Sequence, residues 1–298
     1  MRVSRALLAG VSAVALGGGL AISMAVASPR SVPAEHTVTG HVHLTASFLA
    51  AARAALVKDL RRPDTAQYVS GLPRAGTRAD STSVGSFNWA GYADTSTTAQ
   101  KFTKVSGAWK VPALTCTAED RVTSEWVGLD GATTSTVEQD GTSSQCFQGK
   151  ALYYSWYELY PAGTVEVGTT VAAGDSISAS VTRSGTSYTL KLTDSTHTAN
   201  SFSHTATCAL ATCLDESAEW ITERPAYSTT GIVPEAQFKT DTFTAGSVTA
   251  GGKTTTISGY SGTVDDITCV DSTDTYDIVA TSALTGGNSF TNTWHNSY

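Results

Sequence analysis

The sequence lacks the local signatures of several common enzyme classes. It has no Gly-x-Ser-x-Gly elbow, no His-Glu-x-x-His zinc pair and no glycine-rich loop that could cradle phosphate. It is poor in Lys and Arg, 19 against 26 Asp and Glu, and these basic residues form no stripe. These absences argue against a zinc peptidase, a phosphate-binding enzyme and a nucleic-acid-binding protein. A Ser-His-Asp arrangement is not excluded by composition, because serines are numerous, but no local motif favours it.

Residues 1–27 have the features of a secretory signal peptide. Arg2 and Arg5 precede an uncharged, small-residue apolar run over residues 6–27, which ends in Ala-Val-Ala before Ser28. No later stretch of the chain is apolar enough to span a bilayer. We therefore expect a secreted, extracellular protein with no membrane association in its mature form.

Residues 28–84 differ from the rest of the chain in charge. They carry seven Lys and Arg against four Asp and Glu, whereas residues 85–298 carry ten against 22. Apolar residues recur every fourth position from Leu44 to Leu60, which predicts a helix that ends at Pro63. A basic helical leader on an acidic body predicts a zymogen propeptide that inhibits its own enzyme, followed by an exposed processing linker. A solvated, partly disordered extension is the alternative.

Residues 85–298 are of a size normal for one large β-sandwich domain. Short apolar segments alternate with Gly, Asp, Ser and Thr clusters, and no long amphipathic helical pattern appears. The expected fold class is therefore all-β, an antiparallel two-sheet sandwich with an N-terminal helical propeptide. Strands are predicted at nine sites: residues 87–93, 105–111, 123–129, 152–160, 176–182, 187–192, 219–222, 247–249 and 278–280.

The five cysteines all lie in this body. Secretion favours disulfides over metal thiolates, and the preferred pairing is Cys116 with Cys146 and Cys208 with Cys213, with Cys269 unpaired. Other pairings stay open, because spacing does not fix connectivity. Three histidines of the leader, His36, His41 and His43, are interpreted as polar spacing, so neither a metal nor a cofactor is expected.

Alternation along two predicted strands places candidate site residues on shared faces. Tyr154, Trp156, Glu158 and Tyr160 share one face, and Glu219, Ile221 and Glu223 share another. Aromatic walls around carboxylates would suit an extended polymer as substrate. The alternative is that the aromatic residues fill the sandwich core and the glutamates are solvated at strand edges.

Five motifs in order give the body a resemblance to the glutamic peptidases, or eqolisins. They are Phe-Asn-Trp-Ala-Gly-Tyr at residues 87–92, Val-Ser-Gly-Ala-Trp-Lys-Val-Pro at 105–112, Glu-Trp-Val-Gly-Leu-Asp-Gly at 125–131, Val-Glu-Gln-Asp-Gly at 137–141 and Ala-Glu-Trp-Ile-Thr-Glu at 218–223. A further similar segment is Ser-Trp-Tyr-Glu-Leu-Tyr-Pro at 155–161. The resemblance implies a concanavalin-like jelly roll.

By position within these motifs, the resemblance also implies the site. The family's catalytic glutamine falls on Gln139 and its catalytic glutamate on Glu223. Substrate-binding positions fall on Trp126, Asp130, Trp156 and Glu158, and Tyr160 joins them as the last aromatic residue of its strand face. Tyr154 stands where the fungal form of the family has an acid, and the cysteine after that form's Gly-x-Asp-Gly motif is absent here, so its disulfides do not transfer. Glu138 points away from Gln139 and is not expected to replace it.

The expected function is a secreted, acid-active, monomeric endopeptidase that cleaves protein or peptide substrates. Glu223 would act as general acid and base, and Gln139 would stabilise the oxyanion. Two alternatives remain: a glycoside hydrolase with Glu158 and Glu223 as its carboxylate pair, and a carbohydrate-binding module that depends on Trp156.

Overall fold

A computed structural model describes residues 82–99, 101–208, 213–227 and 231–297. The predicted signal peptide, the leader helix, the processing linker and the three leader histidines lie outside these residues. The first described strand begins at Thr82, three residues before the predicted start of the body. Within the described residues, no helix is long and apolar enough to cross a membrane.

The described part is built almost entirely of β-strands, with two single-turn 3-10 helices (η1, Thr198–Asn200; η2, Ile257–Gly259). Hydrogen bonds link most strands in the order β10-β9-β8-β3-β14-β18-β17-β16-β2-β11-β4-β5-β6-β7. The strands are β1 (Thr82–Ser86), β2 (Trp89–Thr95), β3 (Phe102–Lys110), β4 (Arg121–Leu129), β5 (Val137–Phe147), β6 (Lys150–Tyr160), β7 (Val165–Gly168), β8 (Ser176–Ser184), β9 (Ser187–Asp194), β10 (Phe202–Thr207), β11 (Ser217–Glu223), β12 (Ala226–Tyr227), β13 (Gly231–Ile232), β14 (Thr240–Ala250), β15 (Lys253–Thr256), β16 (Thr263–Val270), β17 (Asp277–Thr281) and β18 (Phe290–Trp294).

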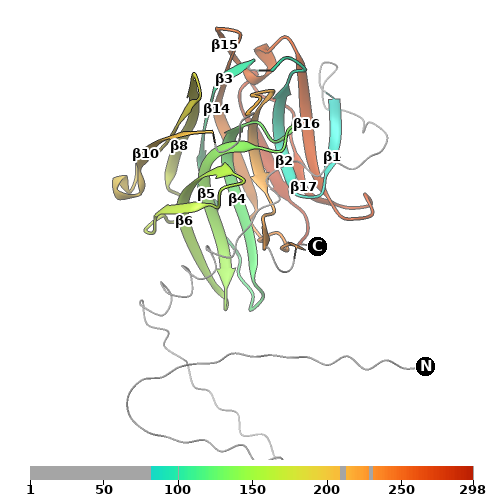
Figure 1. The fold of residues 1–298 in the computed structure, drawn as a ribbon. Helices are drawn as coiled ribbons and strands as arrows, with labels where there is room; N and C mark the ends of the chain where they lie inside the picture. Colours follow the sequence, from blue (N-terminus) through green and yellow to red (C-terminus); the bar gives the residue numbers. More distant parts are fainter. Residues whose placement is uncertain (1–81, 100, 209–212, 228–230, 298) are drawn as a thin grey trace, which may run out of the picture. The chain divides into compact units, whose positions relative to one another are not determined.

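These strands form two packed layers. One layer holds β10, β9, β8, β3 and β14, and the other holds β16, β2, β11, β4, β5, β6 and β7, where β4, β5 and β6 lie side by side (Figure 1). Strand β14 connects the layers, because its first part pairs with β18 and its second part with β3. Named strands pair antiparallel except β1, which is parallel to β16. The predicted antiparallel sandwich is confirmed.

The core between the layers is apolar and continuous. Strands β3, β8 and β9 contact β4, β5 and β11 across it, and its members include Trp109, Val127, Leu190, Trp220 and Phe243, all buried. Burying such large side chains contributes about 1.5–3 kcal/mol each. The face of β4, β5 and β11 that does not pack on this core carries the candidate site.

All nine predicted strand segments overlap observed strands, with only residues 87, 88 and 111 outside them, and β8 and β9 form a hairpin that turns at Gly185. Gly185 has φ 63°, a conformation that glycine adopts without steric cost. Both preferred disulfides are present, Cys116–Cys146 and Cys208–Cys213. The thiol of Cys269 is free and buried, and burial raises its pKa to about 12.

Candidate active site

The predicted catalytic residues lie in one sheet, Gln139 on β5 and Glu223 on β11, with β4 between these two strands. Gln139 on β5 pairs with Gly128 on β4 and with Glu158 on β6, and Gly128 pairs in turn with Glu219 on β11. Directly paired residues project to the same face of a sheet. Glu219, Gln139 and Glu158 therefore share one face, with only a glycine between the first two. We call this face of β11, β4, β5 and β6 the site face.

The side chain of Gln139 is held by a chain of hydrogen bonds. Its Nε2 donates to Oε2 of Glu158 over 2.9 Å, and the hydroxyl of Thr164 donates to the other oxygen of Glu158 over 2.8 Å. Gln139 is fully buried and Glu158 is almost fully buried. Among the described residues, Oε1 of Gln139 has no hydrogen-bond partner. A buried amide oxygen in this state is an acceptor that a water molecule or a substrate could satisfy.

Glu223 lies on the same face but in another row of the sheet. It pairs with Ser124 on β4, which pairs with Ser143 on β5, four residues along the strand from Gln139. The indole Nε1 of Trp126 donates to Oε2 of Glu223 over 2.8 Å. Glu223 and Trp126 are both fully buried. A carboxyl group that accepts an indole N–H is fixed in orientation.

Two glycines make room for the Trp126 side chain. A Cβ placed on Gly128 would lie 2.9 Å from Cζ3 of the indole, so the benzene ring covers Gly128. A Cβ placed on Gly141 would lie 2.6 Å from Cβ of Trp126 and 2.2 Å from the carbonyl oxygen of Glu125. Since the ring of Trp126 covers Gly128, which is in the Gln139 row, and its Nε1 contacts Glu223, the indole stands between that row and Glu223.

Aromatic residues surround this arrangement. Trp89 meets Trp126 edge to face, with ring centroids 5.0 Å apart. Trp156 and Tyr154 join the same buried cluster, and Tyr160 packs against it. The predicted alternation on β6 is confirmed, because Tyr157 and Leu159 belong instead to the core between the layers. The site face therefore carries polar groups set among large aromatic rings.

Glu219 is a site-face residue that the sequence did not single out as functional. Burial raises the pKa of its carboxyl group well above the usual range. Alternation indicated that Glu219 and Glu223 share a face, but only the strand register shows that Glu219 stands in the row of Gln139. It is the second carboxyl group that could exchange a proton near Gln139.

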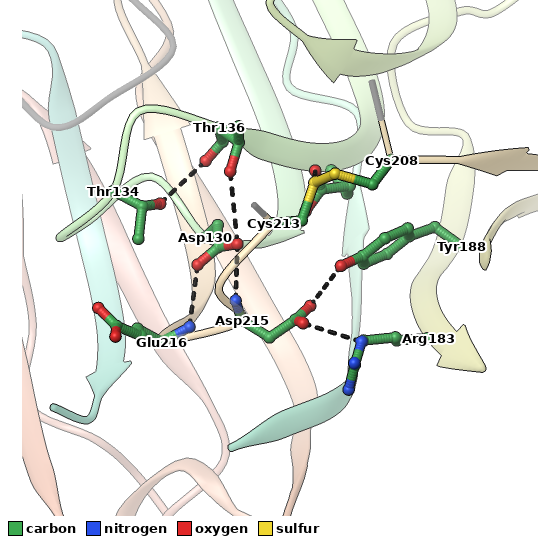
Figure 2. The surroundings of a disulfide bond; sticks show 10 residues. Asp130, Thr134, Thr136, Arg183, Tyr188, Cys208, Cys213, Asp215 and Glu216 are labelled. Atoms are coloured by element: carbon green, nitrogen blue, oxygen red, sulfur yellow. Dashed lines mark hydrogen bonds and ion pairs between the residues drawn. A yellow bond between two sulfur atoms is a disulfide. The ribbon is translucent and has the colours of Figure 1, made fainter. Parts of the chain in front are cut away.

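Glu138 points to the opposite side of β5, as its position next to Gln139 predicts. Its Oε1 lies 3.1 Å from Sγ of Cys213. Figure 2 shows the disulfide between Cys208 and Cys213. Burial, together with the nearby carboxylates of Asp130 and Asp215, raises the pKa of Glu138 to about 9. Glu138 is therefore protonated at neutral pH.

Asp130 directly follows β4 and contacts the backbone before β11. Its two carboxylate oxygens accept the backbone N–H groups of Asp215 and Glu216 over 2.8 and 2.9 Å. Asp215 in turn accepts the hydroxyl of Tyr188 over 2.7 Å and pairs with Arg183 over 2.9 Å (Figure 2). Burial raises the pKa of Asp215 to about 6. These contacts tie Asp130 to the loop that precedes β11.

Metal ligation would have to use groups that are already engaged. Among the described residues, ligand atoms lie within 4.8 Å of one another in three groups: Asp130, Glu138 and Asp215; Asp175, Asp194 and His197; and Glu138 with Cys208 and Cys213, whose two sulfurs form a disulfide. In the second group His197 already contacts Asp175 through Nδ1 over 2.8 Å. In the group of Asp130, Glu138 and Asp215, both aspartates accept hydrogen bonds from protein donors.

Comparison with known proteins gives a consistent set of matches. The model of the peptidase A4 family matches residues 87–294. Scytalido-glutamic peptidase with a peptide-based transition-state analogue is 26% identical, with a TM-score of 0.58 over 70% of this chain and 98% of that one. SCP-B, an eqolisin in complex with the tripeptide Ala-Ile-His, is 25% identical, with a TM-score of 0.56 over the same shares. Aspergilloglutamic peptidase from Aspergillus niger is 28% identical, with a TM-score of 0.50 over 59% of this chain and 99% of that one. A search of curated proteins gives no match.

Proposed function

Because this chain belongs to the peptidase A4 family and is a glutamic-type endopeptidase, we propose that it hydrolyses peptide bonds with Glu223 as general acid and base and Gln139 as oxyanion stabiliser. The observation that carries this assignment is that both side chains lie on the site face and are each held by a specific partner, Trp126 for Glu223 and Glu158 for Gln139. Catalytic groups need such fixed geometry.

The reaction follows from the chemistry of the two side chains. The Glu223 carboxylate takes a proton from water, and the water oxygen forms a bond to the carbonyl carbon of the substrate. The carbonyl π electrons move to oxygen, and the resulting oxyanion accepts an N–H of Gln139. Protonated Glu223 then gives its proton to the amide nitrogen, the C–N bond breaks, and an acid and an amine leave. Glutamine suits this role because its amide stays neutral at every relevant pH.

Buried carboxyl groups support activity in acid. Burial raises the pKa of Glu235 to about 8 and that of Asp241 to about 7, and it raises the pKa of Glu125 strongly. A carboxyl group whose pKa is higher in the folded than in the unfolded protein favours folding at low pH, and this contribution is lost as pH rises through the folded value. These three groups therefore stabilise the folded enzyme most in acid.

The proposal includes secretion as a zymogen and action as a monomer on protein or peptide substrates. It rests on the signal-like residues 1–27 and on the basic leader at residues 28–84. The two related structures with a transition-state analogue and a tripeptide bind peptide-like molecules, which supports peptide substrates here. Family membership also favours a peptidase over the glycoside hydrolase and carbohydrate-binding alternatives.

Three variants test the assignment of the proton-transfer group. Glu223→Gln and Gln139→Ala should both abolish cleavage of an acid-denatured protein, whereas Glu219→Gln should keep cleavage at a measurable rate. Thermal unfolding of each variant shows whether it is folded. Activity retained by Glu223→Gln and lost by Glu219→Gln would transfer the proton-transfer role to Glu219, which stands in the row of Gln139.

A further inference from the structure

The hydrogen bonds around Gln139 determine which way its amide group points. An amide side chain presents an oxygen on one side and an NH₂ group on the other, and the neighbouring groups decide between the two orientations. The partner of Gln139 is a carboxyl group, Glu158, at 2.9 Å. Because Nε2 of Gln139 donates to Oε2 of Glu158, the NH₂ group faces Glu158 and Oε1 faces away.

Glu158 is itself held from the other side. The hydroxyl of Thr164 donates to Oε1 of Glu158 over 2.8 Å, while Oε2 takes the N–H of Gln139. Glu158 is only 2% exposed, and it pairs directly with Gln139 across β5 and β6. Both oxygens of this carboxyl group therefore face donors of the protein itself, which distinguishes Glu158 from a residue that reaches out to a substrate.

We propose that Glu158 is a positioning residue that fixes the orientation of the Gln139 amide, and that Thr164 fixes Glu158. This inference rests on the proposed function, in which Gln139 stabilises the oxyanion. With one N–H bound to Glu158, the second N–H of Gln139 and its Oε1 both remain for the oxyanion and the attacking water. In the opposite orientation the amide would present its oxygen to Glu158, which would place two acceptors together, and Oε1 would no longer be available to orient the attacking water.

A series of substitutions should lower kcat in a fixed order. Thr164→Val removes only the hydroxyl that donates to Glu158 and should lower kcat a few-fold. Glu158→Gln keeps the shape but allows both amide orientations, so kcat should fall by about 10-fold. Glu158→Leu removes the hydrogen-bond partner of Gln139. It should lower kcat by nearly as much as Gln139→Ala, about 100-fold or more, which is typical for loss of one oxyanion donor. KM should change little, because the lost interaction acts in the transition state. A rise in KM at constant kcat would instead make Glu158 a substrate-binding residue.

A double-mutant cycle separates a positioning role from a direct one. If Glu158 acts only through Gln139, then Glu158→Leu should have no further effect on kcat in the Gln139→Ala background, although it is costly in the wild type. Additive losses would overturn the inference. If Gln139→Ala keeps full activity, the proposed function itself is wrong. If Gln139→Ala loses activity but Glu158→Leu keeps it, only the positioning role of Glu158 is wrong.

An exchange of the two residues guards against simple loss of folding. The double variant Gln139→Glu with Glu158→Gln keeps one carboxyl group and one amide in contact, so its melting temperature should return toward that of the wild type. Its activity should not return, because the amide is no longer at the position of Gln139. Recovery of activity together with stability would contradict the positioning role. Glu119→Gln, at an exposed carboxyl group, is the matched control and should match the wild type.

Discussion

The indole N–H of Trp126 donates to the carboxylate of Glu223 across adjacent strands, over 2.8 Å and with both side chains buried. The two residues are 97 positions apart in sequence, and antiparallel pairing of β4 with β11 brings them together. This contact orients the carboxyl group that we propose transfers the proton. It also explains why a large aromatic residue stands at the centre of a site whose chemistry is carried by a glutamate and a glutamine.

Trp126→Phe should therefore reduce kcat while the protein stays folded. Phenylalanine keeps most of the apolar contact but has no N–H, and a hydrogen bond to a charged group is worth about 1.5–3 kcal/mol, which corresponds to about 10- to 100-fold in rate. Trp220→Phe is the matched control, because Trp220 lies in the core between the layers and donates to the Ser106 carbonyl. It should lower the melting temperature more than kcat. Equal kcat values in the two variants would argue against the role of the Trp126 contact.

Gly141→Ala should both destabilise and inactivate the enzyme. A Cβ at this position would lie 2.2 Å from a backbone carbonyl oxygen and 2.6 Å from Cβ of Trp126, so strand β4 and the indole must shift. Overpacking of this kind costs about 1–3 kcal/mol. Gly163→Ala is the control, since a Cβ there has nothing within 4 Å. Melting curves and kcat should separate the two alanine variants clearly, and a wild-type profile for Gly141→Ala would show that the close packing is not required.

Glu138→Gln should flatten the pH dependence of stability. The pKa of Glu138 is about 9 in the folded protein against an ordinary value of 4.5, so its contribution is complete below about pH 4.5 and is lost as pH rises toward 9. Facing it are the carboxylates of Asp130 and Asp215, with Arg183 paired to Asp215. Glutamine does not titrate and keeps the neutral shape. At pH 8 the variant should melt about 5 °C or more above the wild type.

The measurement is a series of thermal melts between pH 4 and 9 on both proteins. At pH 4 the two melting temperatures should nearly coincide, because Glu138 is protonated in both the folded and the unfolded wild type. Glu119→Gln should follow the wild type throughout. Parallel curves for the wild type and Glu138→Gln would mean that ionisation of Glu138 does not limit stability at high pH.

Local pattern predicted much of this structure. Alternation placed Glu219, Ile221 and Glu223 on one face and Glu138 opposite Gln139, because successive residues of a strand always point to opposite sides. Strand β5 itself was not among the predicted segments. Its stretch through Asp140, Gly141 and two serines has low intrinsic strand preference, and burial between β4 and β6 overrides it.

Contacts that depend on strand register could not be predicted from the sequence. The row that joins Glu219, Gly128, Gln139 and Glu158 combines three strand pairings, and a shift by one residue in any of them would change the row completely. For the same reason the cluster of Glu138 with Asp130 and Asp215 could not be foreseen. Motif resemblance predicts that Asp130 binds substrate, and this stays a prediction; the hydrogen bonds of its carboxylate to the backbone N–H groups before β11 are known only from the structure.

Cleavage of an acid-denatured protein between about pH 2 and 7 tests the central claim most directly. The wild type should cleave in acid, and Glu223→Gln and Gln139→Ala should each lose this activity by at least about 100-fold while they melt as folded proteins. Full acid proteolysis by folded Glu223→Gln would contradict the proposed mechanism, because catalysis would then not need the carboxylate that Trp126 orients.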